Sequence, residues 1–129
     1  GIAGVLLAHA MFDLTLIQAS THARTGPSQL LSEAVATFGL LLTIAGCMRS
    51  RPGAVAAAAG LYIAAAYWFT ASTSFANPAV TLARSLTDTF AGIRPVDVPG
   101  FMAAQLAGAL AATAVARWLF AESAQESNS

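Results

Sequence analysis

Between Pro52 and Ala83 the chain runs for 32 residues without a single charged side chain. A helix that crosses a bilayer needs roughly 20 apolar residues, so this stretch exceeds one span. Shorter uncharged stretches cover residues 98–116, 34–48 and 1–12, and the last holds only His9 among its polar residues. Because 9% of the 129 residues are charged and none is lysine, polar side chains are too few to cover a soluble domain. The sequence therefore predicts a membrane protein.

The uncharged stretches predict four membrane-spanning helices, at about residues 1–18, 30–48, 54–73 and 99–120. A hydrophilic link at residues 49–53 carries two arginines followed by Pro-Gly, which separates the second span from the third. Small residues recur at every fourth position of the last span, at Ala104, Gly108, Ala112 and Ala116. Such a stripe favours close contact with a neighbouring helix.

Charge and residue types exclude several classes of function. The net charge is zero, so the chain lacks the basic surface with which a protein binds nucleic acid. The single cysteine, Cys47, and the two distant histidines, His9 and His22, form no recognisable set of metal ligands. No cluster of titratable groups resembles a catalytic site. We therefore expect no enzyme activity, no metal and no cofactor.

The segment STSFANPAVTLAR, residues 72–84, interrupts the longest apolar stretch. Asn77 is suited to cap a helix, and Pro78 suits its first position, which predicts a helix from Pro78 to about Asp88. Such a helix is roughly 16 Å long, about half of a bilayer core. Its N-terminus would present a positive dipole end, free N–H groups and the Asn77 amide to a passing solute. These groups favour a neutral, hydrogen-bonding solute over a cation.

Asn77-Pro78-Ala79 between two spanning helices closely resembles the second NPA motif of the aquaporin and aquaglyceroporin family. Glu33-x-x-x-Thr37 in an earlier span and Gln105-x-x-Gly108 in the last span strengthen the resemblance. It implies an all-α membrane protein, an aquaporin-like bundle with a re-entrant NPA half-helix, here incomplete at about four spans plus one half-helix. Residues 1–129 would be the C-terminal part of a single channel domain, without the first two helices and the first NPA half-helix.

The resemblance also implies a selectivity filter. The position after NPA, usually arginine, is Val80, and the other two filter positions on this chain would be Ser74 and Ala65. All three are uncharged and Ser74 and Ala65 are small, as in bacterial members whose filter arginine is replaced. We expect a wide filter that passes water and small neutral solutes, namely glycerol-like polyols or neutral metalloid hydroxides such as arsenous acid.

Two charged residues near this segment have more than one interpretation. Arg84 lies four residues after Val80 and could place a charge at the outer mouth of the pore, or it could pair with Asp88 and extend to the interface. Glu33 could relay protons, but in the resembled family a glutamate here supports the re-entrant loop by accepting backbone N–H bonds, which is the preferred interpretation.

The expected surroundings follow from the same resemblance: membrane lipid and small neutral solutes as partners, a homotetramer in the full-length form, and a multi-pass location in the inner cell membrane. Arginines accumulate on the cytoplasmic side. The two sides of the predicted bundle carry equal numbers of arginines, so the arginine count does not decide the orientation. The resemblance assigns residues 49–53 and the C-terminal tail to the cytoplasm. The alternative is a truncated, non-transporting membrane subunit that packs against a partner. A secondary transporter is disfavoured because the spans lack paired carboxylates.

Overall fold

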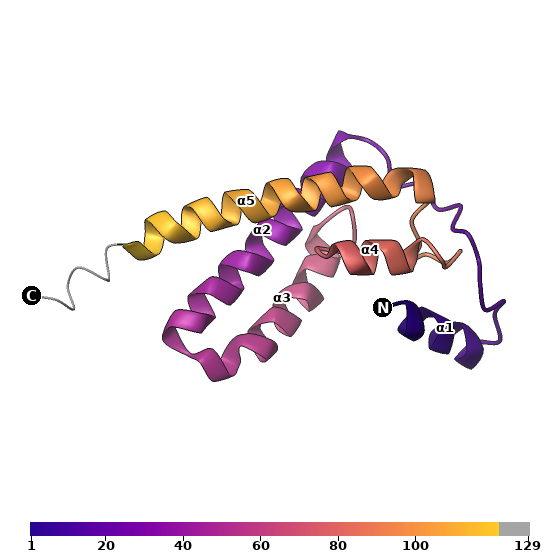
Figure 1. Ribbon diagram of the computed structural model, residues 1–129, viewed down its shortest axis with the longest axis horizontal. Helices are drawn as coiled ribbons and strands as arrows, with labels where there is room; N and C mark the ends of the chain where they lie inside the picture. The colour runs from indigo at the N-terminus through magenta and orange to yellow at the C-terminus, as the bar shows by residue number, and fades with distance from the viewer. Residues whose placement is uncertain (122–129) are drawn as a thin grey trace, which may run out of the picture.

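The computed structural model describes residues 1–121, and all regular structure in that range is helical (Figure 1). Five α-helices follow one another: α1 (Ile2–Met11), α2 (Pro27–Ser50), α3 (Val55–Phe69), α4 (Pro78–Arg84) and α5 (Val98–Ala121). Short 3-10 turns precede two of them, η1 (Pro52–Ala54) before α3 and η2 (Pro95–Asp97) before α5. The predicted all-α class is confirmed. The expected cytoplasmic tail lies outside the described residues.

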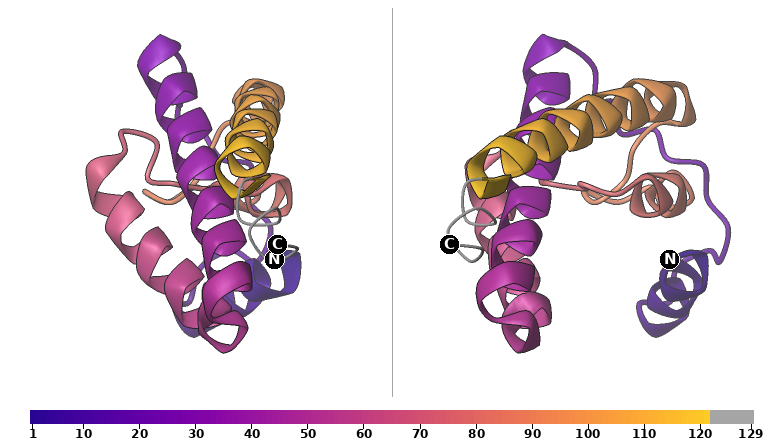
Figure 2. Two further views of the ribbon diagram at one scale, coloured as in Figure 1. Left: turned by 90° about the vertical axis from the view of Figure 1, so that its left-hand side faces the viewer. Right: turned by 60° about the vertical axis from the view of Figure 1, so that its left-hand side comes forward.

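Three helical segments are long and apolar enough to cross a membrane, at Pro27–Ser50, Pro52–Phe69 and Pro95–Ala121. In Figure 1, α2 and α3 form a hairpin, α5 crosses beside α2, and the short α4 lies below the first half of α5. The right-hand view in Figure 2 shows α1 apart from the hairpin, below α4. The half-helix is therefore held between a bundle of three long helices and α1.

The backbones of α2 and α5 approach each other closely. A Cβ atom added to Gly108 of α5 would overlap with the backbone carbonyl of Ala34 in α2. Ala36 of α2 and Ala112 of α5 are fully buried, at 0% and 1% exposure. Small side chains let the two backbones approach this closely. The predicted close contact is confirmed at Gly108 and Ala112, whereas Ala104 and Ala116 of the same stripe are only half-buried.

The first helix is shorter than predicted. It ends at Met11 rather than near residue 18, and its 10 residues are too few to cross a bilayer. Asp13 adopts a left-handed φ of 54°, and the N–H of Leu14 turns back to bond the carbonyl of His9. This geometry closes a helix C-terminus. Apolarity alone predicted residues 12–18 as helix, and the local turn at Asp13 overrides it.

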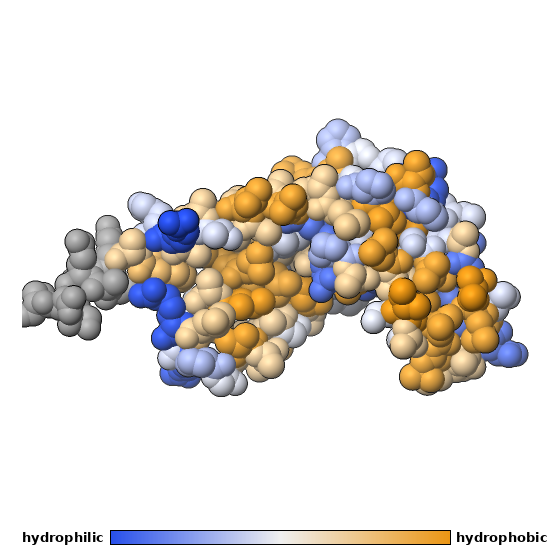
Figure 3. Space-filling view, in the orientation of Figure 1, coloured by the Kyte–Doolittle hydropathy of each residue, from blue (hydrophilic) through white to orange (hydrophobic). Residues whose placement is uncertain are grey.

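Much of the outer surface is apolar, as expected where lipid or further helices cover it. Large side chains such as Leu61 and Trp68 are 73% and 84% exposed. Figure 3 shows apolar residues spread over this face, and the face is hollowed between the part formed by α1 and the rest of the bundle. A soluble monomer does not expose apolar surface on this scale.

The Gly108 contact gives a direct test of the packing. We expect Gly108→Ala to lower the free energy of unfolding of the chain in detergent micelles by roughly 1–3 kcal/mol, because the added methyl group overpacks the α2–α5 contact. Gly60→Ala is the matched control, since a Cβ atom at that helical position meets nothing within 4 Å. Thermal unfolding followed by circular dichroism measures both variants, and equal stability of the two would contradict the packing described.

Candidate functional site

The loop before α4 enters the bundle in an irregular conformation. After α3 ends at Phe69, Thr73, Ser74 and Ala76 adopt positive φ angles of 61°, 52° and 49°. A left-handed conformation costs a non-glycine residue about 1 kcal/mol or more, so other contacts must hold the loop in place. Phe75, Ala76 and Ser74 are all buried. The loop is thus part of the interior rather than a surface connection.

Asn77 and Pro78 begin α4 as the sequence predicts. The Asn77 Oδ1 atom accepts hydrogen bonds from the N–H groups of Ala79 (2.8 Å) and Val80 (3.4 Å), and Pro78 occupies the first turn. The N–H of Thr81 bonds the Asn77 carbonyl. The first N–H groups of α4 are therefore occupied, contrary to the expectation that they would be free for a solute.

The half-helix is shorter than predicted, because it ends at Arg84 rather than near Asp88. Beyond Arg84 the backbone N–H groups bond carbonyls three residues earlier instead of four. The N–H of Ser85 donates to the carbonyl of Leu82, and the N–H of Leu86 donates to the carbonyl of Ala83. These i to i−3 bonds are typical of a terminating helix. The seven residues of α4 extend roughly 10 Å, about a third of a bilayer core.

Glu33 holds the loop from inside the bundle. Its side chain is completely buried in α2, and its carboxylate accepts the backbone N–H groups of Phe75 (3.2 Å) and Ala76. Ser74, which precedes these two donors, and Ala76, which is one of them, are left-handed. A carboxylate is an acceptor only, so it suits a position surrounded by donors.

Gln105 of α5 completes this network. Its Nε2 atom donates to Glu33 Oε1 (2.9 Å) and to Thr81 Oγ1 (2.8 Å) in α4. Thr81 Oγ1 in turn donates to the carbonyl of Asn77 (2.9 Å). One buried polar cluster, Glu33–Gln105–Thr81, therefore joins α2, α5 and the start of α4.

The three residues expected to form the filter lie in different environments. Ala65 is exposed on α3, Ser74 is buried in the loop, and Val80 is half-buried on α4 against the cluster of Phe75, Ile93, Val98 and Phe101. The Ser74 hydroxyl has no hydrogen-bond partner among residues 1–121. A buried hydroxyl without a protein partner needs another partner, such as water or a solute.

Arg24 is a structural residue that the sequence did not reveal. Its buried guanidinium donates to three backbone carbonyls, those of Gly92 (2.7 Å), Ser72 (2.9 Å) and Phe90 (2.8 Å). It joins the loop before α4 to the loop after it. The signal for this role is absent from the local sequence, because the acceptors lie 48 to 68 residues further along the chain.

The suggested ion pair between Arg84 and Asp88 does not form. Asp88 lies beyond the end of α4, so the helical spacing on which the pair depends is absent. Its Oδ1 atom accepts hydrogen bonds from the N–H (2.7 Å) and the hydroxyl (2.8 Å) of Thr21 instead. These two bonds lower the pKa of the exposed Asp88 below its ordinary value, the backbone bond contributing most.

A cavity of about 620 Å³ lies between α1 and one side of α4. Val80 and Arg84 line it from α4, and His9 lines it from α1. His9 is buried, with its Nε2 2.8 Å from Thr87 Oγ1 and its Nδ1 2.9 Å from the carbonyl of Leu16. Because both ring nitrogens are occupied within the chain, His9 serves as a packing residue here.

A family model for the major intrinsic proteins matches residues 27–129, which is most of the chain and includes α2 to α5. The chain belongs to this family. The resemblance drawn from the NPA motif is thereby confirmed at the level of the family. Members of this family are channels, in keeping with the expectation that the chain is not an enzyme.

One curated relative is the aquaglyceroporin AqpS of Rhizobium meliloti strain 1021. It is 62% identical over 118 residues, which cover 92% of this chain and 51% of AqpS. The chain thus spans about half the length of this relative. No solved structure matches the chain.

Substitution of Glu33 tests whether the buried hydrogen bonds stabilise the loop before α4. In Glu33→Gln the new amide nitrogen cannot accept a hydrogen bond, so one of the donors from Phe75, Ala76 or Gln105 loses its acceptor. We expect the free energy of unfolding in micelles to fall by about 1–3 kcal/mol. Asp13→Asn is the control, because Asp13 is exposed and asparagine tolerates its left-handed φ. A loss no larger than that of the control would contradict the role of Glu33.

The pKa of Asp88 gives a prediction for pH dependence. Because its folded pKa lies below the ordinary value of 3.8, the two bonds to Thr21 stabilise the fold above that pH. This contribution is lost as the pH falls through the folded pKa. In a carboxyl carbon NMR titration we expect the midpoint of Asp88 to lie below 3.8 and to rise in Thr21→Val, which removes the hydroxyl donor. An unchanged midpoint would show that the hydroxyl bond is not made.

Proposed function

We propose that this chain forms one half of a passive membrane channel for water and small neutral solutes. The observation that carries the proposal is the half-helix α4, which starts at the NPA motif inside the bundle and is fixed there by Glu33 and Gln105. Asn77 is exposed, and its Oδ1 atom is used by the cap. Its amide nitrogen donates no hydrogen bond within residues 1–121, so it remains a donor for the oxygen of a passing solute.

Val80, Ser74 and Ala65 are proposed to set the width of the constriction. Two of the three are small, and Val80 replaces a long cationic side chain with a compact apolar one. Ser74 brings a buried hydroxyl without a protein partner, which suits a solute that carries hydroxyl groups. We therefore assign glycerol-like polyols as solutes, in line with the relative AqpS being an aquaglyceroporin. Neutral metalloid hydroxides such as arsenous acid are assigned on chemical grounds alone, because they too are small, uncharged and carry hydroxyl groups.

The pore is proposed to be complete only with a second half. Residues 1–129 would be the C-terminal part of one channel domain, and the full-length protein would form a homotetramer in the inner membrane. In the experiments below, the complete channel is this chain preceded by a first half, taken from its own gene where the gene continues upstream of Gly1, and otherwise from AqpS. The alternative of a non-transporting subunit predicts no flux through it.

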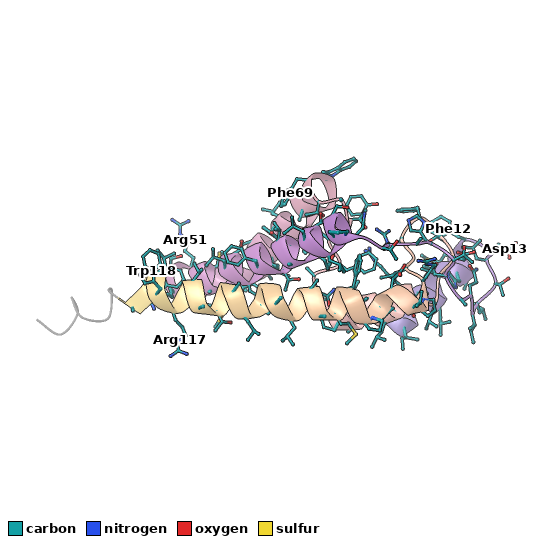
Figure 4. The ribbon with its side chains drawn as sticks, turned by 90° about the horizontal axis from the view of Figure 1, so that it is seen from above. Phe12, Asp13, Arg51, Phe69, Arg117 and Trp118 are labelled. Atoms are coloured by element: carbon teal, nitrogen blue, oxygen red, sulfur yellow. The ribbon has the colours of Figure 1, made fainter. Side chains whose placement is uncertain are left out.

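The orientation is proposed from the arginines that the fold leaves exposed. Arg51 and Arg117 lie together with Trp118 at one end of the long helices, and Phe12 and Asp13 lie at the other (Figure 4). Arg51 and Arg117 are exposed, whereas Arg24 at the opposite end is buried among carbonyl groups. Exposed arginines favour the cytoplasmic side. Residues 49–53 and the C-terminus of α5 are therefore assigned to the cytoplasm.

Val80→Arg tests the wide filter. In vesicles that contain the complete channel, we expect the substitution to abolish glycerol and arsenite flux while sparing water, because a long cationic side chain narrows the constriction. Stopped-flow light scattering under glycerol and water gradients, with an uptake assay for arsenite, measures the three fluxes.

Val80→Met is the matched control, since methionine is long and unbranched but uncharged. It should reduce glycerol flux less than arginine does. If neither variant changes glycerol or arsenite flux, the constriction lies elsewhere. If the unsubstituted channel passes neither solute nor water faster than empty vesicles, the channel proposal itself is wrong.

A further inference from the structure

The guanidinium of Arg84 lies deeper than its position in the sequence suggests. Side chains of an α-helix point toward its N-terminus and cover the preceding turn, which for Arg84 is the turn of Val80. The guanidinium carbon lies 4.3 Å from the ring centroid of Phe75, two residues before Asn77. Val80 packs against the cluster that contains Phe75. The Arg84 charge therefore sits at the level of the NPA loop and Val80 and not at the outer mouth.

Arg84 is not paired directly with a carboxylate, although the more distant Glu33 carboxylate attracts it. Among residues 1–121 Arg84 makes no ion pair, and Asp88 is occupied by Thr21. Arg84 Nη1 is shielded from solvent and donates no hydrogen bond within these residues. A guanidinium that carries an unused donor needs an oxygen acceptor, and a ring face supplies none.

Arg24 has a buried guanidinium with a structural role, and the chain provides hydrogen-bond acceptors for it. Its guanidinium lies 4.9 Å from the same Phe75 ring, but it donates to three carbonyls. Burial lowers the pKa of Arg24 below its ordinary value, and the nearby Arg84 cation adds to the effect. The three carbonyls are thus taken by Arg24, and the two cations repel each other.

Arg84 and Val80 line the same cavity of about 620 Å³. We propose that Arg84 is the specificity-determining cation of this channel, supplied from one helical turn beyond the usual position. Its Nη1 donates to an oxygen of a neutral solute, and its charge repels cations. Val80 widens the constriction, and Arg84 keeps it positive. The inference rests on the proposed channel function and adds the residue that excludes cations.

The test compares Arg84→Gln with Arg84→Lys in vesicles that contain equal amounts of the complete channel, with potassium and methylammonium as the probe cations and glycerol as the probe solute. We expect Arg84→Gln to raise cation flux at least about tenfold, because a fixed charge in a confined site of low dielectric acts strongly on a nearby ion. Arg84→Lys should keep cation flux low, since it keeps the charge. Arg117→Gln is the control, because Arg117 is exposed at the far end of α5.

A double variant separates charge from folding. In Arg84→Gln/Val80→Arg a guanidinium returns to the same face of α4, one turn nearer the NPA motif, so cation flux should fall back toward the original level. Cation flux that stays low in Arg84→Gln, while glycerol passes, would overturn the role of Arg84 and leave the channel function intact. If Arg84→Gln does not assemble, an Arg84→Lys channel that leaks cations would also overturn it. Absence of any glycerol or water flux in the unsubstituted channel would overturn the channel function and this inference with it.

Discussion

The rest of the site depends on the hydrogen bonds that the buried Glu33 carboxylate accepts. A loop with three left-handed, non-glycine residues is unfavourable by itself, and it enters a part of the bundle where water cannot satisfy its backbone. Glu33 accepts two of its N–H groups and the amide of Gln105. Gln105 then reaches Thr81 in α4. Helix packing through Gly108 brings α2 and α5 close enough for this network, so Gly108 in α5 and the buried Glu33 in α2 act together.

Local signals predicted where elements begin better than where they end. Asn77 and Pro78 announce the start of α4 because capping and the missing proline N–H depend on adjacent residues only. The ends of α1 and α4 were wrong by several residues. At Asp13 a left-handed turn stops the helix, and after Arg84 the backbone hydrogen bonds change to the i to i−3 pattern before the predicted end at Asp88.

Long-range contacts explain what the sequence could not reveal about the site. The role of Arg24 depends on three carbonyls far along the chain, and no pattern around residue 24 marks them. Likewise, the partner of Asp88 is Thr21, which no helical spacing could suggest. The family resemblance drew attention to Glu33 and Gln105. The packing of α2, α4 and α5 is what shows that these two side chains bond each other and that Gln105 also bonds Thr81.

In the proposed channel, two tasks that one arginine after the NPA motif usually combines are divided between different residues. Width is assigned to Val80, Ser74 and Ala65, and charge is assigned to Arg84, which folds back over the Phe75 ring. A channel built in this way accepts a bulkier neutral solute without giving up exclusion of cations. Because Asn77 caps the start of α4, few N–H groups remain free there to repel cations. A cationic side chain in this position would supply the positive charge instead.

The most direct measurement is the rate at which vesicles that contain the complete channel swell again in an inward glycerol gradient, with and without gradients of protons and sodium ions. The account predicts swelling much faster than in empty vesicles and the same rate in all ionic conditions, as for a passive pore. Swelling no faster than in empty vesicles, or swelling that requires an ion gradient, would contradict it.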